Sequence, residues 1–313
     1  MARKVKLEKR VPKFDWQECR LPGQGKEIGK AWLLAAFVSA LPLFVVYVSN
    51  QHEFVFYYGG WIVGCWFVYF FLLPRIARAR LVKQGFKARV IGNNYPDLKR
   101  LLTAQSRALG LREPECFVIS EPVAHVTVLG TRRPGFMVAS QMLLGLLTDA
   151  EFTAAVQRAL MHSRLGHVRT QMLVWFMNQT PPIVRLLVAP LAVYTWVLEL
   201  AWATQCEIST DRAWVVYNRD PRVCAAVLLK IAAAADPNIE ATPADIDRLF
   251  APKHLMDQNI VEMGSAFKLK SAIHDNPFIR DRLEALIDFG LSDESVALAK
   301  KMDEAFRAAN VTR

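Results

Sequence analysis

The segment Leu160-Met161-His162-Ser163-Arg164-Leu165-Gly166-His167 carries two histidines near the spacing that binds a metal ion. A helix with the pattern His-Glu-x-x-His places two imidazoles one turn apart, where they bind Zn²⁺, and sets a glutamate beside them as general base. Here the frame ends at His167, so Ser163 stands at the first histidine position and Arg164 at the glutamate position. His162 is one residue out of register. The segment therefore has the outline of a zinc-hydrolase motif without its catalytic groups.

The two replacements remove different parts of that chemistry. A neutral hydroxyl competes badly with an imidazole for Zn²⁺, so Ser163 is a poor ligand. Arg164 cannot be the general base because a guanidinium stays protonated, and losing a general base typically lowers a rate by about 10²–10⁴. On a regular helix His162 and His167 lie about 140° apart, so they would converge on one ion only across a π-bulge. We therefore expect no bound metal and no catalytic residue at the degenerate positions.

The residues before this segment predict a small sheet followed by the helix that carries the near-motif. Helical spacing of leucines predicts a helix over 94–112, and three short β-like runs follow at 116–119, 124–129 and 135–139. A short helix is expected at 141–147. The run Thr148-Asp149-Ala150-Glu151 has the form of a capping box and should open the motif helix. Spacings of three and four then put one set of residues on a single interior face, namely Phe152, Val156, Ala159, Leu160, Ser163 and His167.

Two uncharged stretches near the N-terminus predict a pair of membrane spans. Residues 31–52 and 54–74 contain no Asp, Glu, Lys or Arg, and each is about the ~20 residues that a helix needs to cross hydrocarbon. A polar turn separates them, so 31–74 is predicted to be a transmembrane helical hairpin. Basic residues flank the hairpin on both outer sides, which by the positive-inside rule puts both termini and the large domain in the cytoplasm. The lipid bilayer, as a bacterial-type inner (cytoplasmic) membrane, is thus the first predicted partner.

Composition and charge complete the expected organisation. A basic cytoplasmic segment, 1–30, precedes the hairpin, and 75–313 forms the main domain, with membrane-associated hydrophobic segments at about 170–205. The net charge of +10 lies mainly in the hairpin flanks, which favours anionic headgroups over nucleic acid as its partner. The cysteines show no C-x-x-C spacing, so we expect reduced and mostly buried thiols at Cys19, Cys65, Cys116, Cys206 and Cys224.

In this order of elements the chain resembles the HtpX-type membrane zinc metallopeptidases, the broad family that also holds the CAAX prenyl proteases. The resemblance spans roughly 31–290 and includes the approach to the motif helix over 142–151, the signature Glu207-x-x-x-Asp211, and the segment 277–283, with Asn276 where a histidine usually stands. It implies a mainly α fold with a small β-sheet (α+β), in which a transmembrane hairpin precedes a zincin-like metallopeptidase domain.

The resemblance also implies roles for single residues. Glu207 matches the third zinc ligand, Asp211 the carboxylate that orients a ligand histidine, and Arg282 a residue of the same outer shell. His167 is then a residual ligand position, and His162 a weaker candidate. Because the metal is expected to be absent, we predict that Arg164 pairs with Glu207 and fills the former zinc cleft.

These features favour a degenerate, catalytically inactive pseudopeptidase that binds membrane-protein clients or serves as a fixed subunit of a membrane complex. One alternative is an active zinc metalloendopeptidase of membrane-protein quality control, with an irregular site built from His162 or His167 plus Glu207. A second alternative is a structural membrane anchor whose protease-like domain is only a scaffold. Zinc is expected under the first alternative alone.

Overall fold

The computed structural model describes residues 13–48, 52–83, 94–121, 124–130, 133–178, 180–234, 246–247, 250 and 277–309. These residues form a mainly helical fold with one small sheet, so the α+β prediction is confirmed. Part of the predicted basic segment 1–30, and Asn276, lie outside the described ranges. The division into the domains 1–30, 31–74 and 75–313 stays a prediction.

The sheet has three strands in the order β1-β3-β2, with β1 at Glu115–Ile119, β2 at Val126–Leu129 and β3 at Phe136–Ser140. The central strand β3 runs parallel to β1 and antiparallel to β2, and all of its residues are buried. Its last residue, Ser140, also caps the helix α5 (Gln141–Leu146). The three predicted β-like runs are therefore confirmed.

Both faces of the sheet are covered, because side chains that alternate along a strand point to opposite sides. Cys116 and Val118 of β1 join the larger core cluster, which lies around α6, α10 and α11. Phe117 and Ile119 join a second cluster with the helices α3, α7 and α9. All five cysteines are free and buried, as predicted.

Helices make up most of the described chain. They are α1 (Gln24–Val48), α2 (His52–Phe67), α3 (Leu73–Lys83), α4 (Pro96–Ala108), α6 (Asp149–Leu165), α7 (Val168–Asn178), α8 (Pro182–Leu187), α9 (Ala189–Ala201), α10 (Ala203–Asn218), α11 (Pro221–Ala233), α15 (Pro277–Gly290) and α16 (Asp293–Ala308). A 3₁₀ turn, η1 (Trp16–Cys19), precedes α1, and a π-helical segment, η2 (Val68–Leu72), joins α2 to α3.

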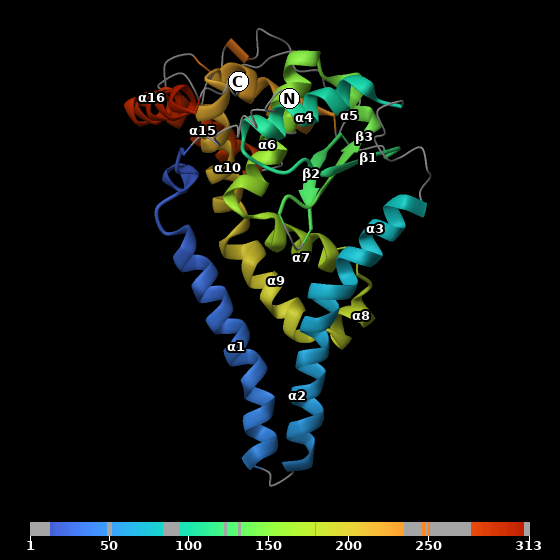
Figure 1. Cartoon of the computed structure of the whole chain (residues 1–313). Helices are drawn as coiled ribbons and strands as arrows, with labels where there is room; N and C mark the ends of the chain where they lie inside the picture. The colour runs from blue at the N-terminus through green and yellow to red at the C-terminus, as the bar shows by residue number, and fades with distance from the viewer. Residues whose placement is uncertain are drawn as a thin grey trace, which may run out of the picture.

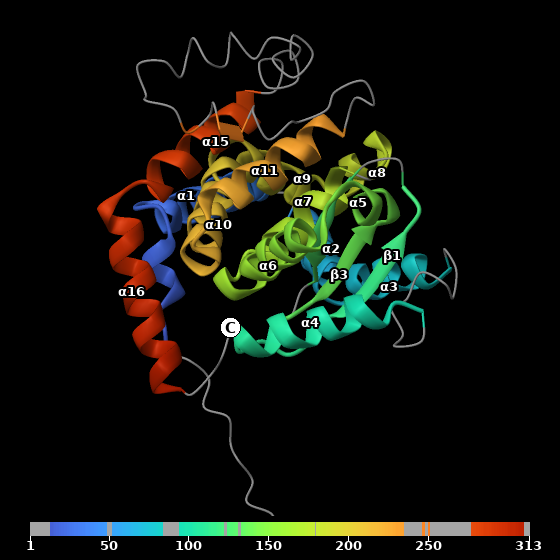
Figure 2. The same ribbon diagram turned by 90° about the horizontal axis from the view of Figure 1, so that it is seen from above.

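The helices α6 and α10 lie at the centre of the fold. The predicted capping box opens α6: the Thr148 hydroxyl accepts from the Glu151 N–H, and the Glu151 carboxylate accepts from the Thr148 N–H. α6 packs on β2, α10 and α11, while α10 also contacts α9, α15 and α16. Seen from above in Figure 2, α15 and α16 lie on the side of α10 away from the sheet. Side chains that project between α6 and α10 are therefore enclosed.

The first two helices run side by side as a hairpin that extends past α8 and α9, away from the sheet (Figure 1). α9 packs along α1, so the hairpin is joined to the rest of the fold. Large apolar side chains nevertheless stay exposed on both hairpin helices, among them Leu33, Phe37, Phe44, Phe56 and Tyr57.

The membrane predictions need correction. Within the described ranges, no helix has both the length and the apolar character required for a membrane span. The uncharged stretch 54–74 is divided among α2, which has 16 residues, η2 and the start of α3, whereas a span needs about 20 residues. The hydrophobic region 170–205 is likewise divided, into α7, α8 and α9 with 11, 6 and 13 residues. The predicted transmembrane hairpin over 31–74, the membrane-associated helices and the integral inner-membrane location are therefore wrong.

Candidate metal centre

The near-motif ends in a tight turn that brings its two histidines together. α6 stops at Leu165, and Gly166 takes the left-handed conformation with φ 85°. The His167 N–H then donates to the His162 carbonyl at 2.9 Å, and the Gly166 N–H donates to the Ser163 carbonyl at 3.2 Å. This pair of bonds is the Schellman motif, which commonly closes a helix at a glycine.

The turn overturns our expectation that His162 and His167 point apart. Because the chain leaves the helix at Gly166, the rotation of a continuous helix does not apply to His167. The two imidazole centroids lie 5.6 Å apart with the rings at 65°. The sequence contained the signal, since a glycine just beyond a periodic segment predicts a helix end.

A cysteine from α10 completes a group that could bind a metal. One ligand atom from each of His162, His167 and Cys206 lies within 4.8 Å of the others. The Cys206 Sγ is 4.0 Å from His162 Nδ1. The three residues are only 3%, 2% and 1% exposed, so the group is enclosed by protein. Sequence analysis missed Cys206 because it precedes the expected ligand Glu207 by one residue and has no cysteine partner nearby in the sequence.

Neutral hydrogen-bonding side chains surround the group. The Thr210 hydroxyl donates to the Cys206 carbonyl at 2.9 Å and lies 3.2 Å from His162 Nδ1 and 3.1 Å from His167 Nδ1. Gln171 Nε2 lies 2.8 Å from His162 Nδ1. These contacts fix both ring orientations from α7 and α10.

Burial sets the protonation of these groups. It lowers the pKa of His162 to about 4 and the pKa of His167 well below its usual value, because the low-polarity interior disfavours an imidazolium. It raises the pKa of the Cys206 thiol well above its usual value for the same reason. Near neutral pH both imidazoles are therefore neutral, which is the form that binds metals.

Next to the histidines lies a cluster of two arginines and two carboxylates, of which Asp211 and Arg282 are buried and Arg158 and Glu207 partly buried. Arg158 Nε donates to Asp211 Oδ1 at 2.8 Å, and Arg158 Nη2 donates to Glu207 Oε2. Arg282 Nε and Nη2 donate to the two oxygens of Asp211 at 2.9 and 3.0 Å, and Arg282 Nη2 lies 3.7 Å from Glu207 Oε2. The two positive and two negative charges balance.

Glu207 is therefore a paired anion. Burial alone would raise its pKa, but Arg158, His162 and Arg282 together hold the pKa of Glu207 well below its usual range. The Glu207 carboxylate also lies 3.7 Å from His162 Nε2, which links the charged cluster to the metal-binding group. The predicted residues Glu207, Asp211 and Arg282 thus lie together, beside His162.

The other two predicted positions lie away from this centre. The Ser163 hydroxyl donates to the Pro134 carbonyl at 3.2 Å. Burial lowers the pKa of Arg164, and the nearby Arg133 lowers it further while Asp15 raises it, so its surroundings are not those of Glu207. The prediction of an Arg164–Glu207 ion pair is wrong.

Helix geometry explains why a different arginine pairs with Glu207. Arg158 precedes His162 by four residues and so lies on the same face of α6, whereas Arg164 lies about 120° away from Arg158 around the axis. The motif frame predicted Arg164 as the partner of Glu207, but the face of α6 that packs on α10 carries Arg158.

Comparison with known proteins gives one related protein of informative similarity. The chain is 30% identical over 159 residues to the Plastoglobule-localized metallopeptidase 48, chloroplastic, of Arabidopsis thaliana. The relationship is metallopeptidase-like. The match covers 47% of this chain and 43% of the relative, so the chain spans less than half of the length of that protein. Neither a protein-family model nor a solved structure matches the chain.

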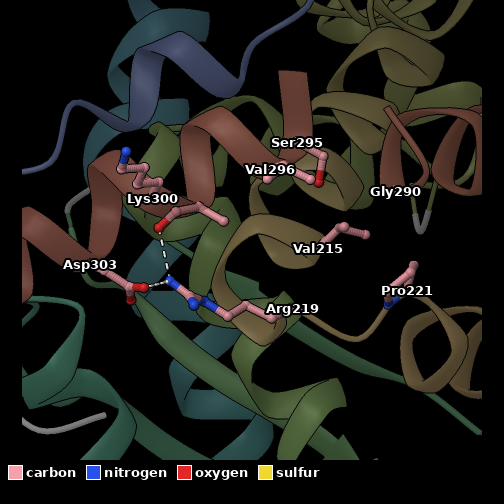
Figure 3. A pocket seen from close by; sticks show the side chains of 9 residues that line it. Val215, Arg219, Pro221, Gly290, Ser295, Val296, Lys300 and Asp303 are labelled. Atoms are coloured by element: carbon pink, nitrogen blue, oxygen red, sulfur yellow. Dashed lines mark hydrogen bonds and ion pairs between the residues drawn. The ribbon is translucent and has the colours of Figure 1, made fainter. Parts of the chain in front are cut away.

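Two surface cavities lie apart from the buried centre. One, of about 310 Å³, lies where the end of α10 meets α15 and α16, and Figure 3 shows Arg219 crossing it toward Asp303. Arg219 also donates to the Ala299 carbonyl at 2.8 Å, so this residue ties α16 to the end of α10. The other, of about 500 Å³, lies between the start of α4 and α6. Neither cavity is lined by the His–Cys group or by the charged cluster.

Proposed function

We propose that this chain is a catalytically inactive homologue of zinc metallopeptidases, of the HtpX type, and that it acts by binding a protein partner. The observation that carries the proposal is the partly buried pairing of Glu207 with Arg158. The resemblance gives Glu207 the role of third zinc ligand. In this structure its carboxylate is instead ion-paired with the Arg158 guanidinium. Separating one partner from a buried ion pair costs about 3–5 kcal/mol, which disfavours release of Glu207 to an ion.

The centre also lacks a suitable general base among the described residues. Proton abstraction is most efficient when the pKa of the base lies near the working pH, and the pKa of Glu207 is far below it. Arg164 stands at the base position of the motif and cannot accept a proton. Both observations support loss of hydrolysis.

Binding needs none of these groups. β2 is an edge strand of the described sheet and packs against α6 and α7, so it lies beside the former catalytic centre. An extended peptide can add to such an edge through backbone hydrogen bonds alone. We propose β2 as the surface that receives a protein client or a fixed partner subunit.

Hydrolysis is tested by digestion of casein with the purified full chain, its Glu207→Gln variant and an exposed control, Glu199→Gln. We expect the same background rate for all three, with and without added Zn²⁺. Zinc-stimulated cleavage that Glu207→Gln abolishes and Glu199→Gln retains would instead establish an active enzyme.

Binding is tested by recovery of the tagged chain from its native source. A heterogeneous set of polypeptides supports client capture, and one constant polypeptide supports a fixed complex. Recovery of the chain alone, under conditions that preserve weak complexes, would contradict a binding role.

A working metalloendopeptidase with an irregular site is the second candidate. The convergence of His162, His167 and Cys206 favours it, because three ligands plus one open position is the usual form of a catalytic zinc site. The casein assay separates it from the first proposal.

A further inference from the structure

We propose that His162, His167 and Cys206 form a closed, structural binding site for a divalent ion of the zinc type, which joins the end of α6 to α10. The site uses neither Ser163 nor Glu207, so it differs from the degenerate motif in its ligands. It also goes beyond the proposed function, since a partner-binding protein needs no metal.

The geometry already approaches that of a bound ion. Zinc lies about 2.0–2.1 Å from imidazole nitrogen and about 2.3 Å from thiolate sulfur, so in a tetrahedral site a nitrogen and a sulfur lie about 3.6 Å apart and two nitrogens about 3.3 Å apart. The Cys206 Sγ and His162 Nδ1 lie 4.0 Å apart. All three ligand atoms lie within 4.8 Å of one another. The farthest pair would have to close by up to about 1.5 Å to reach tetrahedral spacing around one ion.

The neighbouring carboxylate orients one of the ligands. Glu207 Oε2 lies 3.7 Å from His162 Nε2, which favours the tautomer that carries its proton on Nε2. The lone pair of His162 Nδ1 is then directed toward the Cys206 sulfur. A closer approach that brings the carboxylate within hydrogen-bond distance of this outer nitrogen would strengthen metal binding.

The surrounding charges permit a dication. The pairs that Arg158 and Arg282 form with Glu207 and Asp211 balance, so the cluster adds no net positive charge. Binding replaces the S–H bond of Cys206 with a sulfur–metal bond and releases one proton to solvent.

The enclosure indicates a structural and not a catalytic ion. The ligands are at most 3% exposed, and the indole of Trp202 packs edge-on against the His167 ring with centroids 5.6 Å apart. A buried oxygen is available as fourth ligand: Gln171 Oε1 makes no hydrogen bond among the described residues. A half-turn of this amide exchanges its nitrogen, 2.8 Å from His162 Nδ1, for that oxygen.

The test is metal analysis of the full chain purified without chelators, followed by removal of metal and titration with Co²⁺. We expect about one zinc ion per chain and, with Co²⁺, a near-ultraviolet band from a sulfur–cobalt bond. Cys206→Ser should lose that band and bind at least about tenfold more weakly. Cys224→Ser, a matched change of another buried cysteine on α11, should retain both properties.

Thermal unfolding gives a readout that does not depend on the variants. Zn²⁺ should raise the melting temperature of the metal-free wild-type chain, whereas Mg²⁺ should not, because thiolate and imidazole ligands do not suit Mg²⁺. Absence of zinc both as purified and after reconstitution would refute the site. Equal Co²⁺ spectra for Cys206→Ser and the wild type would refute the ligand assignment. Neither result bears on casein cleavage, so failure of this site and failure of the proposed function are distinguishable.

Discussion

Replacement of Arg158 by methionine should destabilise the fold strongly, because it leaves a buried carboxylate without its main partner. Arg158 contacts both Glu207 and Asp211, and its side chain is 15% exposed. Removing one member of a buried ion pair costs about 3–5 kcal/mol. Arg282 keeps both bonds to Asp211 and lies 3.7 Å from Glu207, so we expect the lower part of that range, about 3 kcal/mol.

The double variant Arg158→Met/Glu207→Gln separates this cost from lost packing. Because the uncompensated charge is absent, its free energy of unfolding should recover about 1–2 kcal/mol relative to Arg158→Met alone. Arg164→Met is the matched control, and we expect a change below about 1 kcal/mol, since a residue outside such a network contributes little. Urea unfolding followed by circular dichroism measures all three. Equal losses for Arg158→Met and Arg164→Met, or no recovery in the double variant, would refute the assignment of Arg158 as the partner of Glu207.

Three further predictions follow from the same region and from the end of α10. As the pH falls from 6.5 to about 4, the metal-free chain should lose up to about 3 kcal/mol of unfolding free energy. Over this range the histidine of the unfolded chain binds a proton, whereas buried His162 in the folded chain stays neutral. A flat profile of unfolding free energy against pH would contradict this. Gly166→Ala should cost about 1 kcal/mol or more, because its backbone is left-handed at φ 85°, whereas Gly145→Ala, in open space on α5, should be neutral or stabilising by thermal melting. Arg219, at φ 64°, should be better replaced by glycine than by alanine by about 1 kcal/mol, and equal melting temperatures would show that its backbone is not strained.

Much of the fold could be predicted because its signals are local. The strands follow from short β-branched and aromatic runs, and the start of α6 follows from Thr148 and Glu151, whose side chains need only the neighbouring backbone to form a capping box. The prediction of membrane spans was wrong because it did not rest on a local signal of this kind. Absence of charge over 31–52 and 54–74 shows which residues are apolar, but not how the chain folds, and the structure divides 54–74 among three elements.

The candidate site was predicted only in part, because it depends on contacts between distant segments. Glu207, Asp211 and Arg282 could be named from spacing and resemblance. Arg158 and Cys206 could not, since a paired arginine and a lone cysteine carry no motif. Their proximity to the other groups arises from the packing of α6 on α10, which joins residues about fifty positions apart.

The charged cluster gives a structural reason for the polar residues at this centre. Arg158 and His162 are one turn apart on α6, and Glu207 and Asp211 are one turn apart on α10, so the two faces meet as complementary pairs. Removing one charged member leaves its partners with less compensating charge, at a cost of about 3 kcal/mol for Arg158. Retention of Glu207 and Asp211 is therefore accounted for by stability alone. The residue that pairs with the Glu207 carboxylate is Arg158, not the arginine at the motif's glutamate position.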